Sequence, residues 1–248
     1  MHIEENTFSN TNASGRNTSA TIKFSHRTLN IGHSVIHQIR ISFLDTTVLH
    51  ELCQSHSILL PEPIRHSRPK RQLEFVAGRL AAQYALQPFG YRHITLATGT
   101  CGEPLFPESL QGSISHSIYA QHCTAVASVQ KIQPAQPYMG IDIEHQQHQH
   151  NLDTRPNRLN LFLHPREQQL IATQISPQQA LLIFSAKESI IKAWFHRYQH
   201  LISFSAITYQ TADSHKLIFQ VHAQPAAPQL AIVHYRFSQQ EIITLACI

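Results

Sequence analysis

The sequence has few charged residues, few glycines and few cysteines. Charged side chains make up only 14% of the 248 residues, against roughly a quarter in most globular proteins. The four cysteines lie far apart with no C-x-x-C pair, so neither a disulfide framework nor a cysteine zinc site is indicated. No apolar run approaches the ~18 residues of a transmembrane helix, and the N-terminal residues lack the features of a signal peptide. We therefore expect a reduced, cytoplasmic globular protein.

Acidic residues are scarcer than basic ones, with 15 Asp and Glu against 19 Lys and Arg and a net charge of +4. An enzyme that needs several carboxylates at one site has few from which to build it. A charge of +4 on a chain of this length is weak support for nucleic-acid binding. The 42% of hydrophobic residues is enough for a core, in one large domain or two small ones.

Composition divides the chain into a tail and two halves. Residues 6–19 are mostly Asn, Thr and Ser, which predicts a flexible tail. A Gln- and Pro-rich break at 133–137 separates two regions that each contain helix material and mostly hairpin-linked strands. This pattern indicates an α+β fold. The expected divisions are a tail at 1–20, one half at 21–136 and a second half at 137–248.

One long helix is predicted in the middle of each half. Apolar residues recur every three to four positions from Leu73 to Tyr84, which predicts a helix over 70–86 that Pro88 ends. Ser176, followed by Pro and then by Gln three positions after the Ser, predicts an N-cap and a helix to about Arg197. Shorter helical stretches are expected at 158–162 and 165–173.

Strands and loops are predicted elsewhere. The expected strands lie between 22 and 48 and at 93–97, 123–130, 138–144, 206–211, 216–224, 230–237 and 241–248. The expected loops lie at 60–69, 98–107 and 145–150, and the segment GSISHS at 112–117 is expected to lead into the strand at 123–130.

Two acidic motifs are candidates for a metal site. In GIDIE, Asp142 and Glu144 alternate on a predicted strand and so share one face, and oxygen ligands of this kind suit Mg²⁺. In FSAKESIIKA, Glu188 lies on the apolar stripe of the predicted helix and needs a partner, with Lys192 one turn away. The alternatives are two unrelated acids on a solvated strand end and a simple Glu–Lys surface pair.

Basic, hydroxyl and imidazole side chains are candidates for binding phosphate. A cluster of basic residues precedes and enters the first predicted helix: Arg65, Arg68, Lys70, Arg71 and Arg79. It indicates a phosphate-rich ligand or a solvated face. The loop GEPLFP and the segment GSISHS supply groups that can donate to phosphate or ribose oxygens. The sequence has no G-x-S-x-G elbow, which argues against a hydrolase triad. Three histidines at 145–150 allow a metal site, although a polar loop is favoured.

In this order, the motifs GEPLFP, GSISHS, GIDIE and FSAKESIIKA resemble those of the surfactin-synthetase-activating class of 4′-phosphopantetheinyl transferases. The upstream stretch RPKRQLEFVAGRLAAQYAL narrows the resemblance to the enterobactin synthase component D branch. The resemblance spans about residues 60–204. It implies a pseudo-dimer of two similar α+β halves in one monomeric chain, with coenzyme A in the cleft between them.

The resemblance also implies roles for individual residues. Asp142, Glu144 and Glu188 match ligands of Mg²⁺, and Lys192 matches the lysine that contacts the diphosphate. Ser115 and His116 match a pair at the 3′-phosphate, and residues 102–107, beginning Gly102, Glu103 and Pro104, match the loop along adenine and ribose. Arg71 and Arg79 are implied phosphate contacts, with Lys70 an additional candidate. Catalysis is assigned to Asp142, Glu188 and Lys192, with Glu188 or a metal-bound hydroxide as the base.

The implied reaction is transfer of 4′-phosphopantetheine from coenzyme A to a serine of an apo carrier protein, with release of 3′,5′-ADP. The implied acceptor is an aryl or peptidyl carrier of siderophore or other non-ribosomal peptide synthesis. Two departures from the family pattern are Glu103, where a lysine is common, and Phe106, where tryptophan is common; the segment after Ala193 also differs. The alternatives are an acyl carrier of fatty-acid or polyketide synthesis, a nucleic-acid-binding module using residues 65–79, and a histidine-loop metal carrier.

Overall fold

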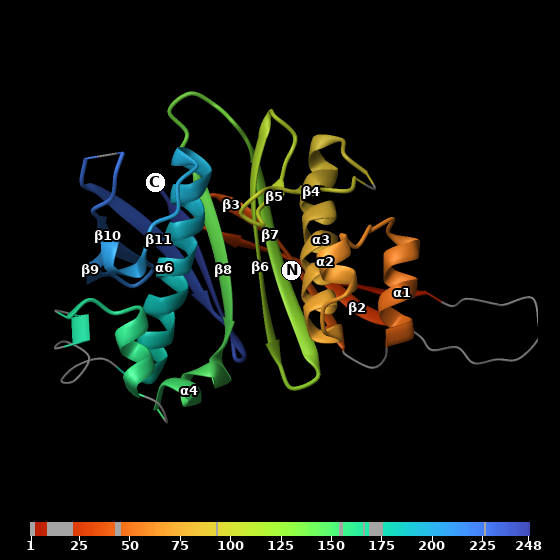
Figure 1. Ribbon diagram of the computed structural model, residues 1–248, viewed down its shortest axis with the longest axis horizontal. Helices are drawn as coiled ribbons and strands as arrows, with labels where there is room; N and C mark the ends of the chain where they lie inside the picture. Colours follow the sequence, from red (N-terminus) through yellow and green to blue (C-terminus); the bar gives the residue numbers. More distant parts are fainter. Residues whose placement is uncertain are drawn as a thin grey trace, which may run out of the picture.

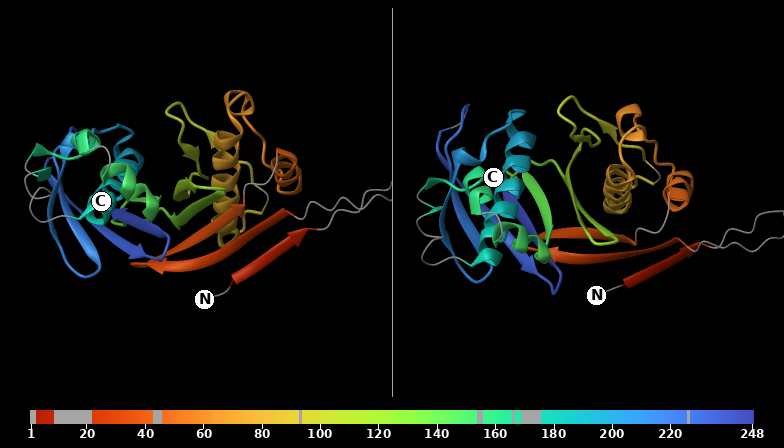
Figure 2. Two further views of the ribbon diagram at one scale, coloured as in Figure 1. Left: turned by 90° about the horizontal axis from the view of Figure 1, so that it is seen from below. Right: turned by 60° about the horizontal axis from the view of Figure 1, so that its bottom comes forward.

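The computed structural model describes residues 3–8, 22–42, 46–92, 94–153, 156–165, 167–168, 176–225 and 227–248. In this part of the chain, two five-stranded antiparallel sheets lie side by side, each with a long helix of its own (Figures 1 and 2). The predicted α+β class and the two similar halves are confirmed. Within the same residues, no helix has both the length and the apolar character needed to cross a membrane.

The first half consists of one sheet with helices on one face. Its strands, in spatial order, are β1 (Ile3–Phe8), β2 (Ile22–Ile31), β3 (Ser34–Ser42), β7 (His122–Lys131) and β6 (Leu110–Tyr119). Its helices are α1 (Thr46–Ser55), α2 (Glu62–Arg65), α3 (Pro69–Leu86) and the 3₁₀ turn η1 (Gln87–Phe89). Leu52 of α1 and Leu80 of α3 are buried in one hydrophobic cluster with Ile39 and Ile41 of β3, and the predicted apolar stripe of α3 belongs to this core.

The second half repeats this arrangement around α6 (Pro177–Tyr198), which begins with the predicted capping box at Ser176 and Gln179. Its strands, in spatial order, are β8 (Met139–His145), β12 (Glu241–Cys247), β11 (Gln229–Phe237), β10 (Lys216–Val221) and β9 (Ile207–Ala212). Its shorter elements are η2 (Gln146–His148), α4 (Gln149–Asp153), η3 (Pro156–Leu161) and η4 (Phe204–Ala206). Trp194 and Phe219 are fully buried where α6 meets the sheet.

The two halves meet where the edge strands β6 and β8 lie next to each other (Figure 1). Side chains of β6 satisfy the backbone N–H groups of β8, which an edge strand leaves unpaired. The Ser113 hydroxyl accepts from Ile141 N at 3.0 Å, and the Ser117 hydroxyl accepts from His145 N at 3.1 Å. Short hydroxyl side chains at every second position of β6 therefore join the sheets.

A second contact between the halves is centred on the buried carboxylate of Glu241, on β12. This carboxylate accepts from Gln38 Nε2 at 2.8 Å, from Thr124 Oγ1 at 2.8 Å and from Arg27 Nη2 at 3.2 Å. All three donors belong to the first half. Because a buried charge is stable only when it is paired, Glu241 fixes how the two halves sit against each other.

Three predictions about local structure are wrong. Ile3–Phe8, expected in a flexible tail, form β1 and pair with β2; residues 9–21 lie outside the described residues. The strand at 93–97 is reduced to β4 (Ala97–Thr98), which pairs with β5 (Pro104–Leu105) in the loop, and residue 93 is not described. The histidine-rich stretch at 145–150 is not a loop, because it ends β8 and continues through η2 into α4.

Other elements differ in position or type. GSISHS does not precede a strand but forms the middle of β6, which a tight turn at Ala120 joins to β7. Helix α1 was not predicted: its first residues, 46–48, were expected in a strand, and no element was assigned to residues 49–55. The helical stretch at 158–162 is the 3₁₀ helix η3, and most of 165–173 lies outside the described residues.

Gly140 is required by the packing of β8 against α6. A Cβ atom at this position would lie 2.1 Å from Ser189 O and 2.5 Å from Ala193 N, both of which are backbone atoms that cannot move aside. We expect Gly140→Ala to lower the free energy of unfolding by about 3 kcal/mol, the upper range for overpacking. Denaturant unfolding measures this, with the exposed Gln133→Ala as the control; equal stability of the two variants would contradict the packing.

Candidate active site

Asp142 lies at the centre of the candidate site and joins three elements. It is buried on β8, and its Oδ1 accepts from Ser115 Oγ of β6 at 2.7 Å and from Lys192 Nζ of α6 at 2.8 Å. Its Oδ2 accepts from Ser185 Oγ, also on α6, at 2.8 Å. Ile141 and Ile143 are buried on the opposite face of β8, as the alternation predicted.

Lys192 is held at the same point. Its Nζ also donates to Ser115 Oγ and to Ile141 O, each at 3.0 Å. In the described part of the chain, Lys192 forms its ion pair with Asp142 and not with Glu188, so the alternative of a simple Glu–Lys surface pair is wrong. The charge of Lys192 therefore lies at the contact between the two halves.

Glu144 and Glu188 add two carboxylates beside Asp142. Burial raises the pKa of Glu188, and the charges of Asp142 and Glu144 raise it further. Burial also raises the pKa of Glu144, with Asp142 adding to the shift and the hydrogen bond from His148 opposing it. Burial and neighbouring negative charge raise the pKa values of both Glu144 and Glu188, and such crowding of carboxylates favours the binding of a cation.

This donor set fits Mg²⁺ better than a transition metal. Within the described residues, no three His, Cys, Asp or Glu side chains lie close enough together to form a preformed metal cage. Mg²⁺ needs no such cage, since it keeps several waters and takes one or two carboxylates plus phosphate oxygens of a substrate. The oxygen atoms of Asp142, Glu144 and Glu188 match that chemistry.

His148 is a site residue that the sequence reasoning placed in a loop. Its Nδ1 lies 2.7 Å from Glu144 Oε2, and its Nε2 lies 3.1 Å from Ile118 O. Both neighbours are acceptors, so the ring donates from both nitrogens, and the hydrogen bond to Glu144 raises the pKa of His148. The spacing of four residues between Glu144 and His148 was the available signal.

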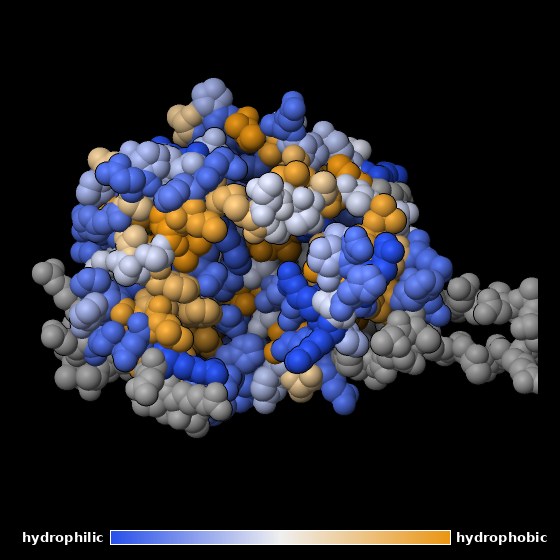
Figure 3. All heavy atoms as spheres, in the orientation of Figure 1, coloured by the Kyte–Doolittle hydropathy of each residue, from blue (hydrophilic) through white to orange (hydrophobic). Residues whose placement is uncertain are grey.

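Arg71 and His116 form a basic group next to this site. Arg71 Nη1 lies 3.2 Å from His116 Nε2, and burial lowers the pKa of His116, with the charges of Arg71 and Lys192 contributing. Figure 3 shows strongly hydrophilic residues gathered over α2 and the start of α3. Lys70, Arg65 and Arg68 in this region are exposed or partly exposed.

Arg79 is buried rather than exposed to a ligand. Its Nη2 donates to Thr98 Oγ1 at 3.0 Å and its guanidinium stacks 4.5 Å from the Phe75 ring centroid. Burial, followed by the charge of Arg71, lowers its pKa to about 10. Its buried Nε has no hydrogen-bond partner in the described residues. Arg71 is exposed whereas Arg79 is buried, so the two arginines do not contribute to the basic group in the same way.

The loop at 98–107 forms one wall of a cavity of about 240 Å³ between the two halves. The opposite wall is α6 with the segment after it, and the lining includes Gly102, Pro104, Lys192, Phe195 and His196. Gly102 has a φ of +87°, which requires glycine. Glu103, which replaces the common lysine, accepts from Cys101 N at 2.9 Å and so stabilises its own loop.

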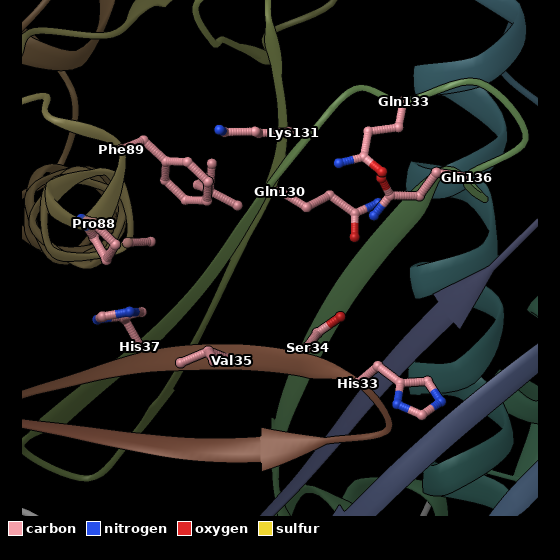
Figure 4. A pocket seen from close by; sticks show the side chains of 12 residues that line it. His33, Ser34, Val35, His37, Pro88, Phe89, Gln130, Lys131, Gln133 and Gln136 are labelled. Atoms are coloured by element: carbon pink, nitrogen blue, oxygen red, sulfur yellow. The ribbon is translucent and has the colours of Figure 1, made fainter.

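Other cavities contain fewer of the expected residues. One of about 350 Å³ lies between the end of α3, β3 and the linker before β8 and contains none of the sequence-predicted site residues (Figure 4). Another of about 500 Å³ is lined by apolar residues such as Phe162 and Phe184 and adjoins Glu144 and His148. The expected residues thus gather at the contact of the halves.

The lysine of the FSAKES motif, Lys187, forms a buried ion pair with Glu167. Lys187 Nζ donates to Glu167 Oε2 at 2.6 Å and to Phe162 O at 2.8 Å, and both charged side chains are almost completely buried. The other Glu167 oxygen accepts from Tyr209 N at 2.6 Å. This pair, which the sequence reasoning missed, ties α6 to the segment around Phe162 and to β9.

Removing one partner of this pair leaves a buried charge unpaired. We expect Lys187→Met to lower the free energy of unfolding by about 3–5 kcal/mol. Adding Glu167→Gln to Lys187→Met should recover part of the loss, because the unpaired carboxylate is then gone. Urea unfolding of the single and double variants measures both effects, and a further loss in the double variant would contradict the account.

Known proteins resemble the chain over both halves. Residues 138–246 match the 4′-phosphopantetheinyl transferase superfamily, and residues 60–128 match the 4′-phosphopantetheinyl transferase N-terminal domain. Enterobactin synthase component D of Escherichia coli (strain K12) is 32% identical over 197 residues, covering 78% of this chain and 86% of the relative. 4′-Phosphopantetheinyl transferase Svp of Streptomyces mobaraensis is 31% identical over 146 residues, 56% of this chain and 55% of the relative. With these matches joined to the site at Asp142, the chain belongs to the 4′-phosphopantetheinyl transferase superfamily.

Proposed function

We propose that the protein transfers 4′-phosphopantetheine from coenzyme A to a serine of an apo carrier protein and releases 3′,5′-ADP. The observation that carries this proposal is the ion pair of Asp142 with Lys192 at the contact of the two halves, with Glu144 and Glu188 beside it. Membership of the superfamily supports coenzyme A as the substrate. The chain has few charged residues, and four of them, Asp142, Glu144, Glu188 and Lys192, lie near one another at this site.

Coenzyme A binds in the cleft between the halves. The diphosphate lies at Lys192, whose ammonium group is already oriented by Ser115 and by Ile141 O. The 3′-phosphate lies against Arg71 and His116, whose Nη1 and Nε2 atoms are only 3.2 Å apart. The adenosine lies along the loop at 102–107, in the cavity that this loop shares with α6. Arg79, Lys70 and Glu103, which all belong to the first half, complete the part of the site that binds the 3′-phosphate and the adenosine.

Asp142, Glu144 and Glu188 would hold Mg²⁺, and the ion would neutralise the negative charge that develops on the leaving 3′,5′-ADP. The donor chemistry and the mutual repulsion of the three carboxylates support this assignment. A divalent cation also relieves that repulsion, which Lys192 and His148 offset only in part.

In the transfer step, the carrier serine hydroxyl oxygen attacks the β-phosphorus of coenzyme A. The new bond joins this oxygen to phosphorus, and the bond from phosphorus to the oxygen of the 3′,5′-ADP breaks. Lys192 stabilises the charge on the departing phosphate. Glu188 takes the hydroxyl proton, since its carboxylate makes no hydrogen bond or ion pair within the described residues and is partly buried.

The acceptor we favour is an aryl or peptidyl carrier of siderophore or other non-ribosomal peptide synthesis. Relatives named enterobactin synthase component D support this choice over an acyl carrier of fatty-acid or polyketide synthesis. The enzyme acts as a monomer, since one chain supplies both walls of the cleft through its halves at 21–136 and 137–248. Its location in this proposal is the cytoplasm. Binding of nucleic acid through residues 65–79 stays a prediction, and the contact of Arg71 with His116 favours the phosphate site instead.

The transfer is tested by incubating the protein with coenzyme A, Mg²⁺ and an apo carrier, then measuring the carrier's mass. We expect a gain of one phosphopantetheine, lost on adding a chelator and restored by Mg²⁺. Asp142→Asn keeps the side-chain volume but loses the charge, and should lower the rate by about 100-fold or more without changing the circular dichroism spectrum. No gain on any aryl, peptidyl or acyl carrier would rule out the proposal.

The 3′-phosphate contact is tested by comparing coenzyme A with dephospho-coenzyme A, which lacks that phosphate. His116→Ala should raise KM for coenzyme A by about 10-fold, the equivalent of one charge-assisted hydrogen bond, and leave KM for the dephospho form nearly unchanged. The exposed Arg65→Ala is the matched control for loss of a nearby polar group. Equal effects of His116→Ala on both substrates would place the 3′-phosphate elsewhere.

A further inference from the structure

Glu144 is held by one oxygen only. Its Oε2 accepts from His148 Nδ1 at 2.7 Å, with the Ser117 hydroxyl at 3.5 Å. Its Oε1 makes no hydrogen bond within the described residues. A carboxylate on a flexible side chain would otherwise lose rotamer freedom when it binds a ligand. One firm bond at Oε2 removes that freedom in advance and leaves Oε1 available.

His148 can act in this way because it is itself fixed from both halves. It follows β8 in the second half, while its Nε2 donates to Ile118 O of β6 in the first half at 3.1 Å. The His145 ring stacks on Tyr119 with centroids 4.2 Å apart, and the Tyr119 and His148 rings form a T-shaped pair with centroids 6.3 Å apart. The imidazole thus has two hydrogen bonds and an aromatic wall.

We propose that His148 is a positioning residue for Glu144. By donating to Oε2 while anchored to β6, it holds the Glu144 carboxylate so that Oε1 is the oxygen offered to the cation. This inference rests on the proposed function, since it assumes that Glu144 is a metal ligand. It extends that function by giving the histidine-rich segment a role in metal affinity. His148 acts through its hydrogen bond to the ligand Glu144 and does not coordinate the metal itself.

The structure also predicts which hydrogen bond matters. The amide nitrogen of Asn can occupy the position of a histidine Nδ1, and that of Gln can reach the position of Nε2. His148→Asn therefore keeps the bond to Glu144 and loses the bond to Ile118 O. His148→Gln keeps the bond to Ile118 O and loses the one to Glu144. The pair separates positioning of the carboxylate from simple support of the β6–β8 contact.

The experiment titrates the wild-type protein and its variants with Mn²⁺ at saturating coenzyme A, with free Mn²⁺ followed by electron paramagnetic resonance. Mn²⁺ shares the oxygen-ligand preference of Mg²⁺. We expect His148→Ala and His148→Gln to bind Mn²⁺ about 10-fold or more weakly, and His148→Asn to stay within about threefold of the wild type. The exposed His150→Ala is the control and should bind as the wild type does.

Two results would overturn the inference alone: unchanged Mn²⁺ affinity in His148→Ala, or Asn binding no better than Gln at position 148. If His148→Ala fails to fold, the comparison of Asn with Gln decides by itself. If the wild type binds no Mn²⁺ at saturating coenzyme A, both the metal site of the proposed function and this inference fail. That result is distinct from the other two, because it does not depend on any variant.

Discussion

The structure depends on one carboxylate that is buried where the two halves touch. Asp142 receives hydrogen bonds from Ser115 of the first half and from Ser185 and Lys192 of α6. A buried charge without such partners is strongly unfavourable, so these groups must stay together in the folded state. The requirement that stabilises Asp142 therefore also brings β6, β8 and α6 together around Lys192.

The two halves need such a contact because each has its own hydrophobic core. Apolar side chains between the sheets, including Val126 and Ile143, supply a smaller third cluster, and hydroxyl groups along β6 complete the edge of β8. Glu241 adds a second buried anion with donors from the first half. Of the 15 acidic residues in the chain, Asp142, Glu167 and Glu241 are buried in the described part and paired there.

The sequence predicted what depends on local periodicity and missed what depends on distant partners. The helices at α3 and α6 and the strand at β8 follow from the spacing of apolar residues, and the sides on which Asp142 and Ile143 lie follow from alternation. The bonds of His148 to Ile118 O and of Lys187 to Glu167 join residues 30 and 20 positions apart, so no local pattern indicates them. GSISHS was expected only to lead into the strand at 123–130, whereas its serine hydroxyls lie within β6 and join two sheet edges.

The central claim is that coenzyme A binds across the contact of the two halves, around the ion pair of Asp142 and Lys192. A crystal structure of the protein with coenzyme A and Mg²⁺ tests it most directly. The account predicts the diphosphate between Lys192 and the carboxylates of Asp142, Glu144 and Glu188, with the 3′-phosphate at Arg71 and His116. Coenzyme A bound elsewhere, for example in the cavity between α3 and β3, with no metal density at Asp142, would contradict it.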